Sequence, residues 1–163
     1  MNKILAKIKK YWIFIIIILF ILIDQITKNM IIKIIEKKSI LIISEFIKLE
    51  LVKNSGGAFG IGEGNITMFI ITNFIVLGVI IRFLITQKDQ MDQKTKIVLS
   101  IILAGGFSNL IDRILRGYVV DYVKIGEFPV FNIADCLIVI GWISFCLITA
   151  KYTWGEIKKR KEE

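Results

Sequence analysis

Residues 11–28 of this 163-residue chain read YWIFIIIILFILIDQITK and indicate its fold class. The first 13 of them, 11–23, carry no charge and are apolar on every side of a helix. A buried helix of a soluble bundle would instead show polar residues at a spacing of 3.6, so we expect a membrane span. A span needs about 20 residues, and flanking lysines can extend this one by a turn at either end.

Three further stretches without charge lie at 65–81, 97–111 and 136–150. The chain is 55% hydrophobic with a mean hydropathy of +0.70. Soluble domains are about 45–50% apolar even with glycine counted. We therefore predict an all-α membrane protein, a single domain over 1–163 with four transmembrane helices. The expected helix bounds are about 11–31, 65–86, 96–113 and 133–153.

The charges are distributed unevenly between the two faces that four spans create. The face with both termini, residues 1–10, 82–96 and 151–163, carries 13 Lys and Arg against 5 Asp and Glu. The other face, 24–65 and 112–135, carries 9 against 9, so the whole net charge of +8 lies on the first face. The positive-inside rule makes that face cytoplasmic, and both termini are expected there. Anionic lipid headgroups account for the basic balance, and no nucleic acid is implied.

The sequence contains no histidine, which removes the usual neutral-pH base and histidine-based nucleophilic or zinc chemistry. Catalysis would have to rest on carboxylates, hydroxyls or amides. Asp24 is expected to close the first helix and Asp112 the third. Asp121 would lie in the short loop that follows, and Asp135 would open the fourth helix. The four carboxylates are thus predicted to converge at the outer face.

The outer segment between the first two helices, 32–64, is the only sizeable piece outside the predicted spans. Its apolar runs 40–43 and 46–52 are typical of short strands, and a glycine-rich stretch at 54–60 follows them. We expect a small extracytoplasmic β-sheet here, lying over the mouth of the bundle.

The third span ends in the sequence GGFSNLIDR. At helical spacing one face of this segment carries small and polar residues, namely Gly105, Asn109, Asp112 and Arg113. The glycines would allow close helix contact beneath a polar cluster. One interpretation is a packing seam that ends in an interfacial ion pair, and the other is a functional polar site.

Two aspartates have apolar neighbours in the sequence. Asp121 lies within VVDY, and Asp135 directly precedes CLIVI. A carboxylate without a solvated surface must be paired, protonated or functional. A salt bridge to Arg113 or Arg116 would explain Asp121, and helix capping would explain Asp135. Alternatively, the two form an acid–base pair that shares one proton and activates water without histidine or metal.

Five motifs occur in order along the chain. They are Asp24-x-x-Thr27-Lys28, Asn54-x-Gly56-x-Ala58-Phe59-Gly60, Asn109-x-x-Asp112-Arg113, Val119-Val120-Asp121-Tyr122 and Phe131-Asn132-x-Ala134-Asp135. Together with the four-span plan, this set resembles the lipoprotein signal peptidases, the bacterial signal peptidase II family. Ser108 and Phe107 depart from the family pattern, which usually has Gly and Leu at these positions.

The resemblance implies a membrane aspartyl endopeptidase that removes the signal peptide from prolipoproteins by cutting before the diacylglyceryl-modified Cys of the lipobox. It implies that Asp121 and Asp135 are the catalytic pair. Residues that would bind substrate or support the pair are Asn54, Gly56, Asn109, Arg113 and Asn132. A structural polar network would consist of Asp24, Lys28 and Asp112.

The same resemblance implies no cofactor and no metal. The expected partners are prolipoproteins with a diacylglyceryl-Cys and the membrane lipids. We expect a multi-pass monomer in the cytoplasmic membrane, with its active site at the extracytoplasmic face.

Two other functions fit parts of the pattern. A small ion or solute transporter with an acidic outer mouth would need charges near the bilayer midplane, whereas the aspartates are predicted at the outer border. A metal-dependent lipid-headgroup transferase would need carboxylates at i, i+3 or i+4 along one helix. The predicted spans contain no such pair.

Overall fold

Four helices and one three-stranded sheet make up the described part of the chain, which in this computed structural model comprises residues 2–35, 40–43, 46–57 and 61–162. The helices are α1 (Asn2–Ile35), α2 (Ile66–Thr86), α3 (Gln93–Arg116) and α4 (Ile133–Glu162). The strands are β1 (Ile40–Ile43), β2 (Ile47–Asn54) and β3 (Val119–Ile125). Ala58, Phe59 and Gly60 of the glycine-rich motif lie outside the described residues.

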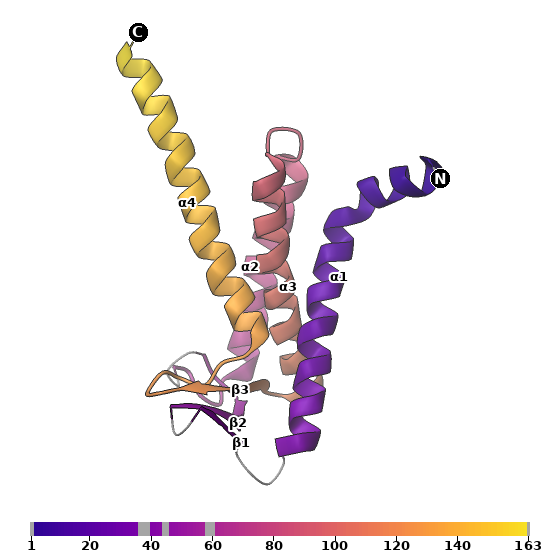
Figure 1. Cartoon of the computed structure of the whole chain (residues 1–163), viewed down its shortest axis with the longest axis vertical. Helices are drawn as coiled ribbons and strands as arrows, with labels where there is room; N and C mark the ends of the chain where they lie inside the picture. The colour runs from indigo at the N-terminus through magenta and orange to yellow at the C-terminus, as the bar shows by residue number, and fades with distance from the viewer. Residues whose placement is uncertain (1, 36–39, 44–45, 58–60, 163) are drawn as a thin grey trace.

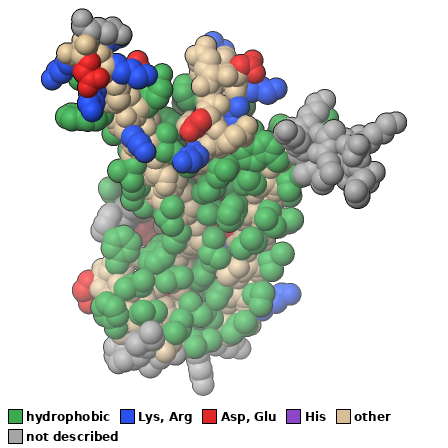
Figure 2. Space-filling view, turned by 45° about the horizontal axis from the view of Figure 1, so that its top comes forward, with side chains coloured by type: hydrophobic (Ala, Val, Ile, Leu, Met, Phe, Trp, Pro, Cys, Tyr) green, Lys and Arg blue, Asp and Glu red, His purple; other side chains and the backbone are tan. Residues whose placement is uncertain are grey.

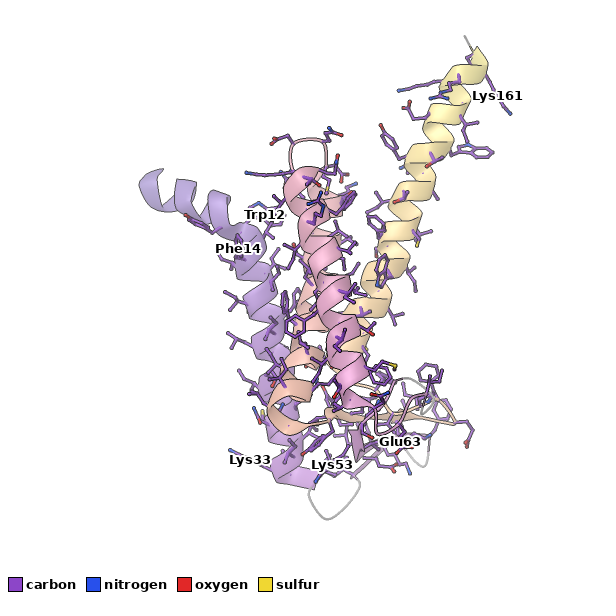
Figure 3. The ribbon with its side chains drawn as sticks, turned by 180° about the vertical axis from the view of Figure 1, so that it is seen from behind. Trp12, Phe14, Lys33, Lys53, Glu63 and Lys161 are labelled. Atoms are coloured by element: carbon purple, nitrogen blue, oxygen red, sulfur yellow. The ribbon has the colours of Figure 1, made fainter. Side chains whose placement is uncertain are left out.

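The sheet lies across one end of the helix bundle, and both termini lie at the other end, beside the turn between α2 and α3 (Figure 1). Toward the end that holds the termini, α4 diverges from the other helices (Figures 1 and 3). The predicted architecture of four apolar helices with a small sheet is confirmed.

All four helices are long and apolar enough to cross a membrane, with mean hydropathies of 1.6 to 2.5 in their apolar windows. In α3, 61% of the window is buried within the protein, against 11 to 17% in the other three helices. The core is therefore built around α3, which packs against α1, α2 and α4. Figure 2 shows hydrophobic side chains over most of the visible face, with Lys and Arg gathered on the helix ends at the top.

Asp24 does not close the first helix, contrary to one expectation from the sequence. The helix ends at Ile35, about one turn beyond the other expected bound of about 31, so Asp24 lies inside it and is fully buried. A helix can carry a buried carboxylate when that carboxylate is paired, and Lys28 one turn further along provides the partner at 2.8 Å. The charge therefore marks an internal polar site rather than a helix boundary.

The segment between α3 and α4, which the sequence analysis treated as a loop, contains the strand β3. The sheet order is β1-β2-β3 with antiparallel pairing, and Asp121 pairs with Val52 while Val119 pairs with Asn54. Gly117, at φ 75°, ends α3 in the left-handed conformation and allows the chain to turn into the strand. The sheet is therefore formed by two separate segments of the chain: β1 and β2 lie between α1 and α2, and β3 lies between α3 and α4.

Close contact between α3 and α4 depends on glycine. A Cβ atom on Gly105 would overlap the carbonyl oxygen of Ala134, and one on Gly141 would overlap the side chain of Ile102. This is the small-residue seam that the GGFSNLIDR segment predicted, and it brings the start of α4 against the polar end of α3.

Candidate active site

A cavity of about 420 Å³ lies where the sheet meets the adjacent ends of α3 and α4. Its polar lining includes Asn54, Asn109, Arg113, Asp121 and Asp135. Its apolar lining includes Phe128, Val130, Ile138 and Val139. Figure 3 labels two charged residues of the lining, Lys53 and Glu63, at the sheet end of the molecule.

Asp121 and Asp135 both contact Asn132. The side-chain Nδ2 of Asn132 donates to Oδ1 of Asp121 at 2.6 Å, and its backbone N–H donates to Oδ2 of Asp135 at 3.2 Å. In return, Oδ1 of Asn132 accepts from the backbone N–H of Asp135 at 2.9 Å. Asn132 therefore caps α4, and Asp135 completes the reciprocal capping box from the first turn. The two carboxylates of the predicted pair are thus held by one buried residue, through its side-chain amide on one side and its backbone N–H on the other.

Two further side-chain amides donate hydrogen bonds to the remaining carboxylate oxygens. Nδ2 of Asn54, at the end of β2, donates to Oδ2 of Asp121 at 2.8 Å. Nδ2 of Asn109, on α3, donates to Oδ1 of Asp135 at 2.8 Å. Every carboxylate oxygen of the pair has an N–H donor, and none of these donors is charged. The arginine partners considered from the sequence for Asp121 are not its hydrogen-bond donors in this structure.

The environment of Asp121 favours its protonated form. Its side chain lies on β3 and is only 2% exposed. Burial raises the pKa of Asp121 to about 7, with a further increase from the negative charge of Asp135. The hydrogen bonds from Asn54 and Asn132 act in the opposite direction, because they favour the carboxylate. Asp121 can therefore hold a proton close to neutral pH.

Arg113 connects α3 to the outer segment. Its guanidinium donates to the carbonyl oxygen of Gly56 at 3.1 Å and lies over the ring of Phe69, 5.3 Å from the centroid. A Cβ on Gly56 would come within 2.9 Å of the carbonyl oxygen of Ile61, so glycine is required at this turn. Arg113 thus fixes the start of the glycine-rich stretch at the cavity wall.

Beneath the cavity lies a buried polar network, which we define as Asp24, Lys28, Asp112 and the residues bonded to them. Lys28 Nζ contacts Oδ2 of Asp24 at 2.8 Å and Oδ2 of Asp112 at 2.9 Å. Three other members of the network were not predicted from the sequence. These are Ser108 and Gln25, which donate to Asp24 and Asp112 respectively, and Arg116, which pairs with Asp112.

The structure thus brings together all ten site residues named from the sequence, seven at or beside the cavity and three in the polar network. The sequence spacing could have indicated the three network members that were not predicted. Ser108 and Arg116 each lie one helical turn from Asp112, and Gln25 is adjacent to Asp24. Among the described residues, no group of three or more His, Cys, Asp or Glu is placed to hold a metal ion.

Comparisons with known proteins identify the family of the chain. A family model described as "Signal peptidase (SPase) II" matches residues 16–151. The lipoprotein signal peptidase of Shouchella clausii is 38% identical over 130 residues, covering 78% of this chain and 85% of the relative. That of Staphylococcus aureus strain JH9 is 35% identical over 162 residues, covering 94% and 98%. A bacterial membrane enzyme solved by the in meso method at 2.3 Å matches with a TM-score of 0.78 and 34% identity, covering 86% of this chain and 88% of that one.

Proposed function

The chain belongs to the signal peptidase II family and removes signal peptides from prolipoproteins, and we propose that it does so as an aspartic endopeptidase. In this proposal Asp121 and Asp135 are the catalytic pair. The observation that carries it is the position of Asn132 between the two carboxylates at the wall of one cavity: its side-chain amide donates to Asp121 and its backbone N–H donates to Asp135. A small transporter, the alternative function from the sequence, is not supported because the family is one of peptidases.

The proposed chemistry requires that two neighbouring carboxyl groups share one proton, so that one is neutral while the other is ionised. Asp121, with its pKa near 7, holds the shared proton and donates a hydrogen bond to the scissile carbonyl oxygen. Ionised Asp135 accepts a proton from water, whose oxygen attacks the carbonyl carbon. When the C–N bond of the tetrahedral intermediate breaks, the departing nitrogen takes a proton from the pair and leaves as an amine. The pair returns to its starting charge when the new carboxyl group leaves.

The amides and Arg113 keep this arrangement in place. Asn54, Asn109 and Asn132 hold the carboxylates without adding charge, which would otherwise fix both of them in the ionised form. Arg113 lines the cavity and holds the carbonyl group of Gly56 beside it, and we assign both residues to binding of the substrate backbone. Asp24, Lys28 and Asp112 act beneath the cavity as the structural polar network.

The lining of the cavity supports a lipid-modified substrate. Ile138 and Val139 belong both to the cavity lining and to the outer turns of α4, and Val139 is 55% exposed on the surface that lipid would cover. A diacylglyceryl chain could remain in the outer leaflet along α4 while its cysteine lies beside the aspartates. We therefore infer that cleavage occurs before the lipidated Cys and that membrane lipids line the route of the substrate.

The orientation follows from the charge distribution. The end of the bundle with both termini carries the excess of Lys and Arg, so we place it in the cytoplasm and the sheet with the active site outside. One copy of the chain contains every site residue named here, and residues 1–163 form a single membrane domain. We propose that it acts as a monomer.

The experiment that tests this function compares two substrates with purified enzyme in detergent. One is a prolipoprotein precursor with a diacylglyceryl-Cys, and the other is the same precursor without the lipid. We expect cleavage of the lipidated precursor alone, with the lipidated Cys as the new N-terminus by mass spectrometry. Equal cleavage of both precursors would contradict the proposed specificity, and cleavage of neither would contradict the proposed activity.

A further inference from the structure

Lys28 lies at the centre of the polar network beneath the proposed catalytic pair. It is a lysine inside a membrane-spanning helix, and its side chain is fully buried. Each N–H of its ammonium group has an oxygen partner: Oδ2 of Asp24 at 2.8 Å, Oδ2 of Asp112 at 2.9 Å and Oδ1 of Asn109 at 2.9 Å. Two of these partners are carboxylates that balance its charge, but the third is neutral and points toward the active site.

The contact with Lys28 determines which way the amide of Asn109 faces. An ammonium group can only donate, so the Asn109 atom beside it is the oxygen and the nitrogen faces Asp135. The same oxygen accepts from Nδ2 of Asn132 at 3.2 Å, which orients the second amide as well. The remaining hydrogen of that nitrogen is directed at Asp121. Lys28 therefore determines the orientation of both amides that donate hydrogen bonds to the two aspartates.

The two carboxylates bound to Lys28 hold the backbone beside the catalytic residues. Oδ1 of Asp24 accepts from the N–H of Ala134 at 2.9 Å, the residue before the catalytic aspartate of α4. Oδ2 of Asp112 accepts from the N–H of Val120 at 3.1 Å, the residue before the catalytic aspartate of β3. The strand and the helix that carry the pair are thus tied to one ammonium group on α1.

We propose that Lys28 is a positioning residue for cleavage, which orients Asn109 and Asn132 so that both amides donate to the catalytic aspartates. This inference rests on the proposed function. From the sequence, Lys28 was expected only in a structural network, whereas here it also affects the rate of cleavage. Lys28 is separated from the aspartates by an amide, so it acts through the amides and not on the substrate. Its removal should slow the chemical step rather than weaken substrate binding.

The test requires a variant that keeps the buried charges balanced. Removing Lys28 alone would leave Asp24 and Asp112 without their shared cation, and such a protein could fail to fold. In the double variant Lys28→Met/Asp24→Asn, Asp112 keeps Arg116 and the new amide can still accept from Ala134. The matched control is Asp24→Asn alone, which keeps Lys28 on Asn109. If the Met variant does not fold, Lys28→Leu/Asp24→Asn replaces it with the same expectation, because leucine also has no hydrogen-bond donor.

We expect kcat of Lys28→Met/Asp24→Asn to be about 10- to 100-fold below that of Asp24→Asn, with KM changed less than about twofold. The alkaline limb of its pH profile should move to higher pH. The positive charge of Lys28 lowers the pKa of Asp121, and this effect is lost in the variant. Arg113 and Asp112 remain as the other charged groups on α3 near the pair in both variants. Loss of stability alone would lower the melting temperature without moving the limb.

A double-mutant cycle shows whether Lys28 acts through Asn109. In an Asn109→Ala/Asp24→Asn background, the further change Lys28→Met should cost less than about threefold in kcat, since its route to the aspartates is already lost. The same 10- to 100-fold loss with and without Asn109 would overturn the inference. An unshifted pH limb and a wild-type kcat in the folded double variant would overturn it as well.

This result is distinguishable from failure of the proposed function. If wild-type enzyme cleaves the lipidated precursor and Asp121→Asn does not, the proposed function stands whatever Lys28→Met/Asp24→Asn shows. If wild-type enzyme does not cleave that precursor, the proposed function has failed, and the role of Lys28 fails with it.

Discussion

Asn54 donates a hydrogen bond of 2.8 Å from its Nδ2 to Oδ2 of Asp121. Its own Oδ1 accepts a hydrogen bond of 2.9 Å from the backbone N–H of Gly56, so the nitrogen of the amide must face the carboxylate. The end of β2 is thereby coupled to the protonation of a carboxyl group on β3. Because the hydrogen bond favours the ionised form, Asn54 lowers the pH at which Asp121 loses its proton.

Cleavage should decline on the alkaline side with an apparent pKa near 7. Burial raises the pKa of Asp121 to about 7, and above this pH the proton that polarises the scissile carbonyl is lost. We expect kcat to fall about tenfold per further pH unit. Asn54→Leu removes a donor to the ionised form, so its alkaline limb should lie at higher pH. The control is Asp92→Asn at the other end of α3, and identical limbs in all three proteins would contradict this assignment.

The stability of the protein should depend on pH through the same group. The pKa of Asp121 is about 7 in the folded protein and 3.8 in an unperturbed carboxyl group. The folded state therefore binds this proton more tightly, and its stabilising contribution is lost as the pH rises from about 4 to about 7. Melting temperatures of wild type and Asp121→Asn at pH 5 and pH 8 should show the larger decrease in wild type. Parallel decreases would mean that Asp121 does not titrate in this range.

Asp121→Asn and Asp135→Asn should each abolish cleavage while the protein remains folded. An asparagine nearly preserves the volume of the carboxyl group but can neither accept a proton from water nor donate one to a carbonyl. Because the two groups act as a unit, the double variant should be scarcely worse than either single variant. Glu127→Gln, an exposed carboxylate on the same face, is the matched control and should cleave at the wild-type rate. Substantial cleavage by either Asp variant would refute the pair.

The helices could be predicted because the membrane imposes a simple rule on them. A span must be apolar over its whole lipid-facing surface, and the charge-free stretch 11–23 showed this directly. The place of Asp24 inside α1 could not be predicted, because a charged residue after an apolar stretch resembles a helix boundary unless its partners are known. Those partners include Ser108, which lies on another helix and 84 residues away.

The third strand and the amide contacts were beyond sequence reasoning for a similar reason. The sequence VVDYVKI has no clean alternation of apolar and polar residues, and it forms β3 because Asn54, Val52 and their neighbours in β2 pair with it. Likewise, Asn132 could be assigned to the site by resemblance, but its position between two carboxylates depends on the start of α4. Non-local pairing, rather than local propensity, determined both features.

Cleavage should survive removal of divalent metal ions. The donors at the pair are amide N–H groups already directed at the carboxylate oxygens, and Arg113 lies close enough to raise the local positive potential. Such a site disfavours a divalent cation, which needs free carboxylate oxygens. Rates measured with and without EDTA should agree within about twofold. A loss in EDTA that added Mg²⁺, Mn²⁺ or Zn²⁺ restores would favour a metal-dependent mechanism.

Gly105→Ala should lower both stability and cleavage, because the new methyl group has no space. A Cβ at this position overlaps the carbonyl oxygen of Ala134, so α4 must shift at the residue that precedes Asp135. Overpacking of this kind costs about 1–3 kcal/mol, and a displacement of about 1 Å at the pair could reduce kcat by about 100-fold. Gly78→Ala on α2 is the matched control, since a Cβ there meets nothing within 4 Å and should leave both quantities unchanged or slightly raise the stability. Melting temperature and kcat are measured on both variants in the same detergent. If Gly105→Ala matched Gly78→Ala in both quantities, the close contact between α3 and α4 would not position Asp135.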